Sequence, residues 1–218
     1  MPANNHELIA MTESVIKEVC IEFRGEGAFN FQTEADIRGA MLGRLRANGN
    51  LRIHTTRGIY DLAHAEMPGY GTSWTGTPRH DLVIWNPALV IEARGHWGDI
   101  PGKWSDILQN GLNLVCIELE KFAGLPWNIR QHEIYSDEGP KIVEQKLRDH
   151  SDLRKLIQCK CTSAYFLLFW DENVGEKDDL DLCYKAIERG LKLISAENPK
   201  IKTACVTKDG RSCFAEFT

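Results

Sequence analysis

The sequence lacks an excess of positive charge. Its 218 residues carry 26 Lys and Arg against 31 Asp and Glu, a formal net charge of −5 at pH 7. A uniformly basic nucleic-acid-binding surface is therefore excluded, whereas a locally basic groove is compatible with this total, because binding depends on where the charges lie. With 43% hydrophobic and 26% charged residues, the composition is that of a folded globular protein and not of a disordered tail.

Long apolar segments are also missing. The longest uninterrupted apolar run, residues 164–170, is far shorter than the roughly 20 residues that a membrane-spanning helix needs. The amino-terminal residues combine no basic stretch with an apolar block, so we expect no secretory signal. These two absences predict a cytoplasmic protein without a membrane partner.

The seven cysteines do not form a disulfide pattern. Their number is odd, and several lie in apolar stretches, which is typical of buried reduced thiols. A chain long enough to build its own core has little need of disulfides, and a reducing compartment is therefore expected. Cys159 and Cys161 form one close pair with no second pair at zinc-finger spacing. A thiol or zinc protein built on this pair is one interpretation of the sequence.

Apolar residues at steps of three and four predict four helices, over residues 6–23, 33–48, about 141–157 and 180–194. Thr33 and Asp36 have the spacing of a capping box at the start of the second helix. Short β-prone runs predict strands over residues 51–56, 80–85, 114–120, 165–170 and 201–207. Asp209 and Gly210 are a possible hairpin turn leading to residues 212–217.

The remaining segments connect these elements. Residues 67–78 are rich in Gly and Pro and predict a loop, and residues 94–113 predict a connection with a short helix. Residues 89–92 could extend the sheet. The order of helices and strands predicts an α/β sandwich in a single domain, residues 1–218, with a mixed central sheet flanked by helices.

Acidic residues inside strands are the most informative feature. Asp81 opens one apolar run, and Glu118 and Glu120 interrupt another. Side chains alternate along a strand, so Glu118 and Glu120 project to the same side, about 7 Å apart, and repel one another unless a cation lies nearby. Mg²⁺ is the usual hard cation where phosphate is the substrate. If the two strands pair, the three acids meet at one edge, although a solvent-facing position on a half-exposed sheet also explains each acid singly.

These segments resemble the PD-(D/E)XK nuclease superfamily, which has the restriction-endonuclease-like fold. That family has an acid at a strand start, then (D/E)-x-K in the next strand, and in many members a glutamate in an upstream helix. The resemblance covers about residues 30–170, with the helix at 6–23 and the segment 177–217 outside it. The matching segments are residues 78–84, 116–121 and 33–38, followed by a helix at 152–156 and the strand at 165–170.

The sequence departs from this pattern at the lysine position, which holds Glu120. Some restriction enzymes of this fold carry glutamate there. Lys121 lies one residue further, on the opposite face of an ideal strand, and would need a β-bulge to reach the site.

The spacing of the half-motifs leaves two registers open. Glu118 lies 37 residues after Asp81, which is a long gap, whereas Glu92 lies only 11 residues after it, with Arg94 in the lysine position. We prefer Glu118, because its strand is the better buried of the two.

The resemblance implies a metal-dependent nuclease that hydrolyses phosphodiester bonds, with DNA as the expected nucleic-acid partner and with roles in restriction, defence or repair. Asp81, Glu118 and Glu120 would bind Mg²⁺ or Mn²⁺, Glu120 would also position or deprotonate a water, and Glu34 would lie near the metal. Further candidates are Lys121 in catalysis and, for phosphate contacts, Arg79, His80, Arg94 and Lys103. A homodimer would fit. The alternative is a catalytically inactive nuclease-fold module for binding or assembly, which the absent lysine favours.

Overall fold

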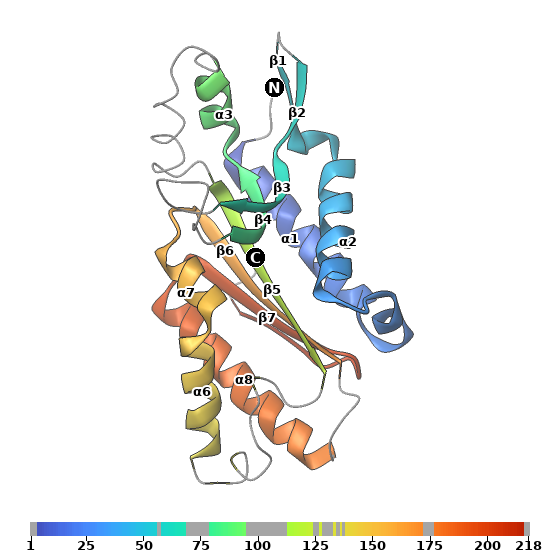
Figure 1. Ribbon diagram of the computed structural model, residues 1–218, viewed down its shortest axis with the longest axis vertical. Helices are drawn as coiled ribbons and strands as arrows, with labels where there is room; N and C mark the ends of the chain where they lie inside the picture. Colours follow the sequence, from blue (N-terminus) through green and yellow to red (C-terminus); the bar gives the residue numbers. More distant parts are fainter. Residues whose placement is uncertain are drawn as a thin grey trace.

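The computed structural model describes residues 4–55, 58–68, 79–94, 113–123, 138–171 and 177–215, together with Trp127, Glu133 and Ser136. Within these residues the architecture is α/β, with a mixed six-stranded sheet between two layers of helices (Figure 1). The predicted fold class is confirmed at this level. The described helices include none whose length and apolarity would let it cross a lipid bilayer.

The sheet has the strand order β3-β4-β5-β6-β7-β8. The central strands β5, β6 and β7 are parallel, and the other neighbours are antiparallel. A separate hairpin consists of β1 (Arg52–Thr55) and β2 (Gly58–Asp61). The sheet strands are β3 (Ala63–Pro68), β4 (Arg79–Trp85), β5 (Asn113–Ala123), β6 (Ser163–Asp171), β7 (Ile201–Thr207) and β8 (Ser212–Ala215).

Helices cover both faces of the sheet, as Figure 1 shows. One layer contains α1 (Asn5–Glu22) and α2 (Glu34–Ala47), and the opposite layer contains α6 (Gly139–Asp149), α7 (Ser151–Gln158) and α8 (Lys177–Glu197). Each layer has its own apolar core against the sheet. A strand covered on both faces has no solvent-facing side, which explains why β6 is an almost continuous apolar run and is buried along nearly its whole length.

Local sequence signals account for the ends of several elements. The predicted capping box of Thr33 and Asp36 begins α2, and the buried stripe of this helix is Ile37, Met41 and Leu45, as predicted. The hairpin between β7 and β8 turns at Gly210, whose φ of 96° favours glycine. The remaining predicted strands, at residues 51–56, 80–85, 114–120 and 201–207, are also present.

Two predictions about secondary structure are wrong. Residues 89–92 lie in the helix α3 (Pro87–Arg94) and not in a strand, because Asn86 accepts the Ala88 N–H and Pro87 favours the first helical position. The helix expected over residues 141–157 is two helices, since His150 between them has an extended backbone. The predicted loop at 67–78 and the connection at 94–113 fall mostly outside the described residues, and the strands β2 and β3 were not predicted.

Candidate active site

Asp81 lies where β4 and β5 cease to pair. The described ladder between these strands ends at Leu82 and Ile117. Beyond that pair, the Leu119 N–H donates to the Asp81 carboxylate at 2.8 Å, and Arg38 of α2 donates to its other oxygen at 3.1 Å. The Asp81 side chain thus accepts a backbone N–H of β5 where the ladder between the two strands has ended, and this hydrogen bond holds its carboxylate beside β5. Burial raises the pKa of Asp81, although the Leu119 N–H and the Arg38 charge act in the opposite direction.

Glu34 approaches this strand end from the helix α2, of which it is the first residue. Burial, followed by the negative charges of Asp81 and Glu120, raises the pKa of Glu34 to about 7; Arg38 acts in the opposite direction, and Asp152 has a smaller raising effect. The carboxylates of Asp81, Glu120 and Asp152, from β4, β5 and α7, are therefore near enough to Glu34 to disfavour its ionised form. Packing of α2 against β4 and β5 brings Glu34 to the strand acids.

Glu118 is almost fully buried, with 1% of its surface exposed, and both of its oxygens have protein partners. One oxygen is 2.5 Å from Nδ1 of His80, and the other accepts from Nζ of Lys155 at 3.2 Å. Burial raises the pKa of Glu118, and the His80 hydrogen bond and the Lys155 charge partly offset this. Glu118 is thus held in a fixed orientation between a strand residue and a helix residue.

Lys155 was not predicted as a site residue. It lies on α7, forms an ion pair with Asp152 at 2.6 Å and also donates to the Arg79 carbonyl at 3.0 Å. Burial lowers its pKa, but the hydrogen bond with Asp152 and the charges of Glu118 and Asp152 more than offset this, so the pKa is raised. A lysine from the helix after the strand thus stands beside Glu118. The available signal was the Asp152–Lys155 spacing of three, which places both residues on one helix face.

Lys121, by contrast, forms its described ion pair with Asp171 of β6, at 3.8 Å. Asp171 lies opposite Ala123 in the parallel ladder between β5 and β6. The structure therefore directs Lys121 toward the neighbouring strand, while Lys155 meets Glu118.

Glu120 has its own partner on the helical side. Nε2 of His150 is 3.3 Å from the Glu120 carboxylate, and Nδ1 of His150 accepts the Asp152 N–H at the start of α7. Ligand atoms of Glu120, His150 and Asp152 all lie within 4.8 Å of one another. Burial lowers the pKa of His150, but the hydrogen bond and charge of Glu120 and the charge of Asp152 outweigh it, so the pKa is raised.

We call Glu34, Asp81, Glu118, Glu120 and Asp152 the acid cluster. The described ion pairs give these five carboxylates two permanently charged partners, Arg38 and Lys155. The cluster therefore carries an excess of negative charge, and its oxygens are ligands that Mg²⁺ and Mn²⁺ prefer.

The structure bears differently on the four predicted phosphate contacts and on the second register of the half-motifs. His80 is only 2% exposed, so the prediction that it contacts phosphate is wrong; its ring is directed into the protein. The Arg79 side chain is exposed, whereas Lys103 and the Arg94 side chain lie outside the described residues. Glu92 lies in α3, so the second half-motif placed on a strand at Glu92 does not fit the fold.

Comparison with known proteins gives no match, whether with protein-family models, with curated proteins or with solved structures. The function of the chain must therefore be inferred from the residues of the site.

Proposed function

We propose that the chain is a metal-dependent nuclease with a restriction-endonuclease-like fold, related to the PD-(D/E)XK superfamily, and that it hydrolyses phosphodiester bonds of nucleic acid, with DNA as the expected substrate. The observation that supports this proposal is the electrostatic coupling of Glu34 to the carboxylates of Asp81 and Glu120, together with the positive charge of Lys155 acting on Asp81. Such a set of acids next to one lysine is what metal-assisted phosphodiester hydrolysis needs.

The acid cluster fits a divalent cation. Mutual repulsion contributes to the raised pKa of Glu34, and a bound cation would relieve it. Glu34, Asp81 and Glu120 are the residues that we expect to hold Mg²⁺ or Mn²⁺. We assign Glu118 to orienting Lys155 instead of to direct ligation, because its side chain is only 1% exposed and both of its oxygens are engaged, whereas the Asp81 side chain is 14% exposed. When bound, the cation would polarise the phosphate and lower the pKa of a water.

The protein's own groups would supply the remaining chemistry. Lys155, held by Asp152 and Glu118, can stabilise negative charge that develops on a phosphate. Glu120 can accept the proton of the attacking water, and His150, whose Nε2 lies beside it while Nδ1 accepts the Asp152 N–H, can orient that carboxylate. The helix α7 thus supplies, with Lys155, the positively charged side chain that the motif on β5 lacks because its lysine position holds Glu120.

A groove next to His150 could accommodate the polyanion. It has a volume of about 870 Å³ and runs along α6, with Lys141, Lys146 and Trp127 in its lining. Lys141 and Lys146 can contact backbone phosphates without sequence preference. Glu138 and Asp149 also line the groove, so its acidic and basic side chains balance.

Cleavage assays with supercoiled plasmid, single-stranded DNA and RNA test the proposal, with Mg²⁺, Mn²⁺ or EDTA added. We expect metal-dependent cleavage that falls roughly 10²- to 10⁴-fold in Asp81→Asn, the range typical for loss of a positioned catalytic group. Lys192→Met is the control, because Lys192 lies on α8 and its described ion pair is with Glu188 of the same helix. No cleavage by the wild type with either metal, or undiminished cleavage by Asp81→Asn, would refute the proposal.

A non-catalytic nuclease-fold module for binding or assembly is the second candidate. The observation in its favour is that Asp81 and Glu118 have protein partners at every oxygen, as in a structural ion-pair network. This candidate predicts stable nucleic-acid or protein binding with no cleavage, and a melting temperature that Mg²⁺ and Mn²⁺ leave unchanged.

A further inference from the structure

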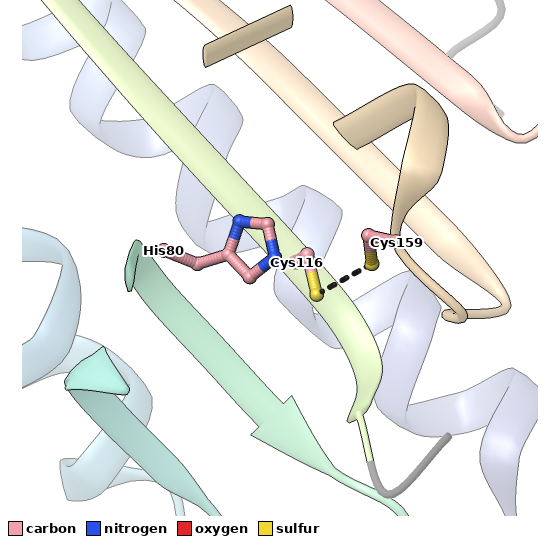
Figure 2. Close-up of side chains that lie close together, drawn as sticks. All are labelled: His80, Cys116 and Cys159. Atoms are coloured by element: carbon pink, nitrogen blue, oxygen red, sulfur yellow. Dashed lines mark hydrogen bonds between the residues drawn. The ribbon is translucent and has the colours of Figure 1, made fainter. Parts of the chain in front are cut away.

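Thiols from separate segments come together around His80, the residue whose imidazole contacts Glu118. Cys116 lies on β5, Cys159 follows α7, and His80 lies on β4 (Figure 2). Sγ of Cys116 is 3.2 Å from Sγ of Cys159, and these two atoms and a ring nitrogen of His80 all lie within 4.8 Å of one another. All three residues are buried.

Cys161 lies near this group without belonging to the three residues whose ligand atoms all lie within 4.8 Å of one another. Interactions with Cys116 and Cys159 lower the pKa of its thiol, which is only partly buried. Lys200 fixes the segment that carries the two cysteines, because its ammonium donates to the carbonyls of Ile157 and Cys159, at 3.0 and 2.6 Å. Two sulfurs and one imidazole therefore lie together, and Cys161, two residues after Cys159 in the segment that Lys200 holds, is the nearby candidate for a fourth ligand.

The orientation of His80 points independently to a ligand. Its Nδ1 is engaged by the Glu118 carboxylate, and Figure 2 shows the other ring nitrogen on the side of Cys116. Histidines that bind metals usually donate their second ring nitrogen to a carboxylate, which fixes the tautomer and directs the free nitrogen at the metal. Glu118 and His80 have this arrangement.

The sulfur spacing agrees better with a metal than with a disulfide. A disulfide requires about 2.05 Å between the sulfurs, and the observed separation is 3.2 Å. Two sulfurs bound to one tetrahedral Zn²⁺ lie about 3.8 Å apart, since each Zn–S bond is about 2.3 Å. A small rotation of either side chain would reach that distance.

We propose that Cys116, Cys159, Cys161 and His80 form a structural Zn²⁺ site that fastens β4 and β5 to the segment between α7 and β6. A set of three cysteines and one histidine closes a tetrahedral zinc site without an open position, so this metal would stabilise the fold and not take part in hydrolysis. Through His80 the site also fixes Glu118. The proposal is independent of the proposed nuclease function.

Metal analysis of the full chain, purified under reducing conditions without chelators, is the first test. We expect close to one zinc per chain. After zinc is replaced by Co²⁺, we expect the intense thiolate-to-cobalt absorption, which reports sulfur ligation and which cobalt bound to the carboxylates of the acid cluster would not give.

The variant Cys161→Ser tests the ligand set, because Cys161 is only partly buried and its replacement should leave the fold intact. Its zinc affinity, measured against a chromophoric chelator, should fall by more than the roughly 10- to 100-fold that loss of an outer-shell partner causes. Cys183→Ser is the matched control, since Cys183 is a buried thiol on α8, and its zinc affinity should equal that of the wild type.

Three results would overturn the proposal. One is folded, reduced wild-type protein with neither zinc nor a cobalt–thiolate band after addition of Co²⁺. Another is equal zinc affinity in the wild type and in Cys161→Ser. The third is a Cys116–Cys159 disulfide found by mass spectrometry in protein that was kept under reductant. The wild-type measurements decide the matter even if a variant fails to fold.

Discussion

Replacing Glu34 by Gln should stabilise the protein above neutral pH and leave its stability unchanged in mild acid. The pKa of Glu34 is about 7 in the folded chain, against an ordinary value of 4.5, because of burial and the charges of Asp81 and Glu120. A carboxyl group whose pKa is raised by folding contributes stability that is fully present below pH 4.5. That contribution is lost as the pH rises through about 7, because ionisation then costs more in the folded state than in the unfolded one.

The size of the effect follows from the same two values. Each pKa unit corresponds to about 1.36 kcal/mol, so a rise from 4.5 to about 7 sets an upper bound of about 3.4 kcal/mol. Glu34 is half-buried, and solvent screening reduces this bound to about 1–2 kcal/mol. Glutamine keeps the shape of the protonated carboxyl group and cannot ionise, so the variant avoids this loss.

Urea unfolding in EDTA at several pH values between 5 and 8.5 measures the difference. We expect the free energies of unfolding of wild type and Glu34→Gln to coincide near pH 5 and to diverge by about 1–2 kcal/mol at pH 8, with the variant more stable. Glu138→Gln is the matched control, because Glu138 is an exposed glutamate on the opposite helix layer. A difference that does not vary with pH, or a variant less stable at pH 8, would refute the raised pKa of Glu34.

Three further predictions address the metal, the lysine and the core. Mg²⁺ at a hundred times its dissociation constant should stabilise the wild type by about 2.7 kcal/mol in thermal unfolding, and Asp81→Asn should lose this gain; equal stabilisation of both would contradict the assigned ligands. Lys155→Met should abolish cleavage whereas Lys121→Met should retain it. The reverse outcome would show that Lys121, and not Lys155, is the lysine that cleavage requires. Tyr165→Phe should lower the free energy of unfolding by about 1.5–3 kcal/mol, because the Tyr165 hydroxyl donates at 2.8 Å to the buried carboxylate of Glu13; denaturant unfolding with an unchanged midpoint would count against that bond.

Local sequence signals were sufficient for most of the secondary structure. Helix periodicity, the capping box at Thr33 and the apolar run at β6 each depend on residues that are neighbours along the chain, and each prediction is confirmed. The prediction of one continuous helix over residues 141–157 failed at His150, and the cause is also local. One residue with extended backbone separates α6 from α7, and the apolar spacing continues across it, so periodicity alone does not reveal the break.

The residues of the candidate site were likewise predicted from the sequence only in part. Strand acids interrupting apolar runs identified Asp81, Glu118 and Glu120, because a carboxylate in a buried strand is unusual enough to be visible in the sequence. The lysine was sought next to the strand motif, at Lys121, whereas the cation beside Glu118 is Lys155, 37 residues further along the chain. His80 was expected at the surface and is buried against Glu118.

The sequence by itself determined which elements form and which of their residues carry unusual chemistry, since alternation, helical spacing and capping act over a few residues. Only the tertiary structure decided which of those residues meet. The helix α7 packs on β5 and β6 and thereby brings Lys155 to Glu118, and α2 packs on β4 and β5 and thereby brings Glu34 to Asp81. Contacts between distant segments depend on the packing of whole helices against the sheet, and no short stretch of sequence encodes that packing.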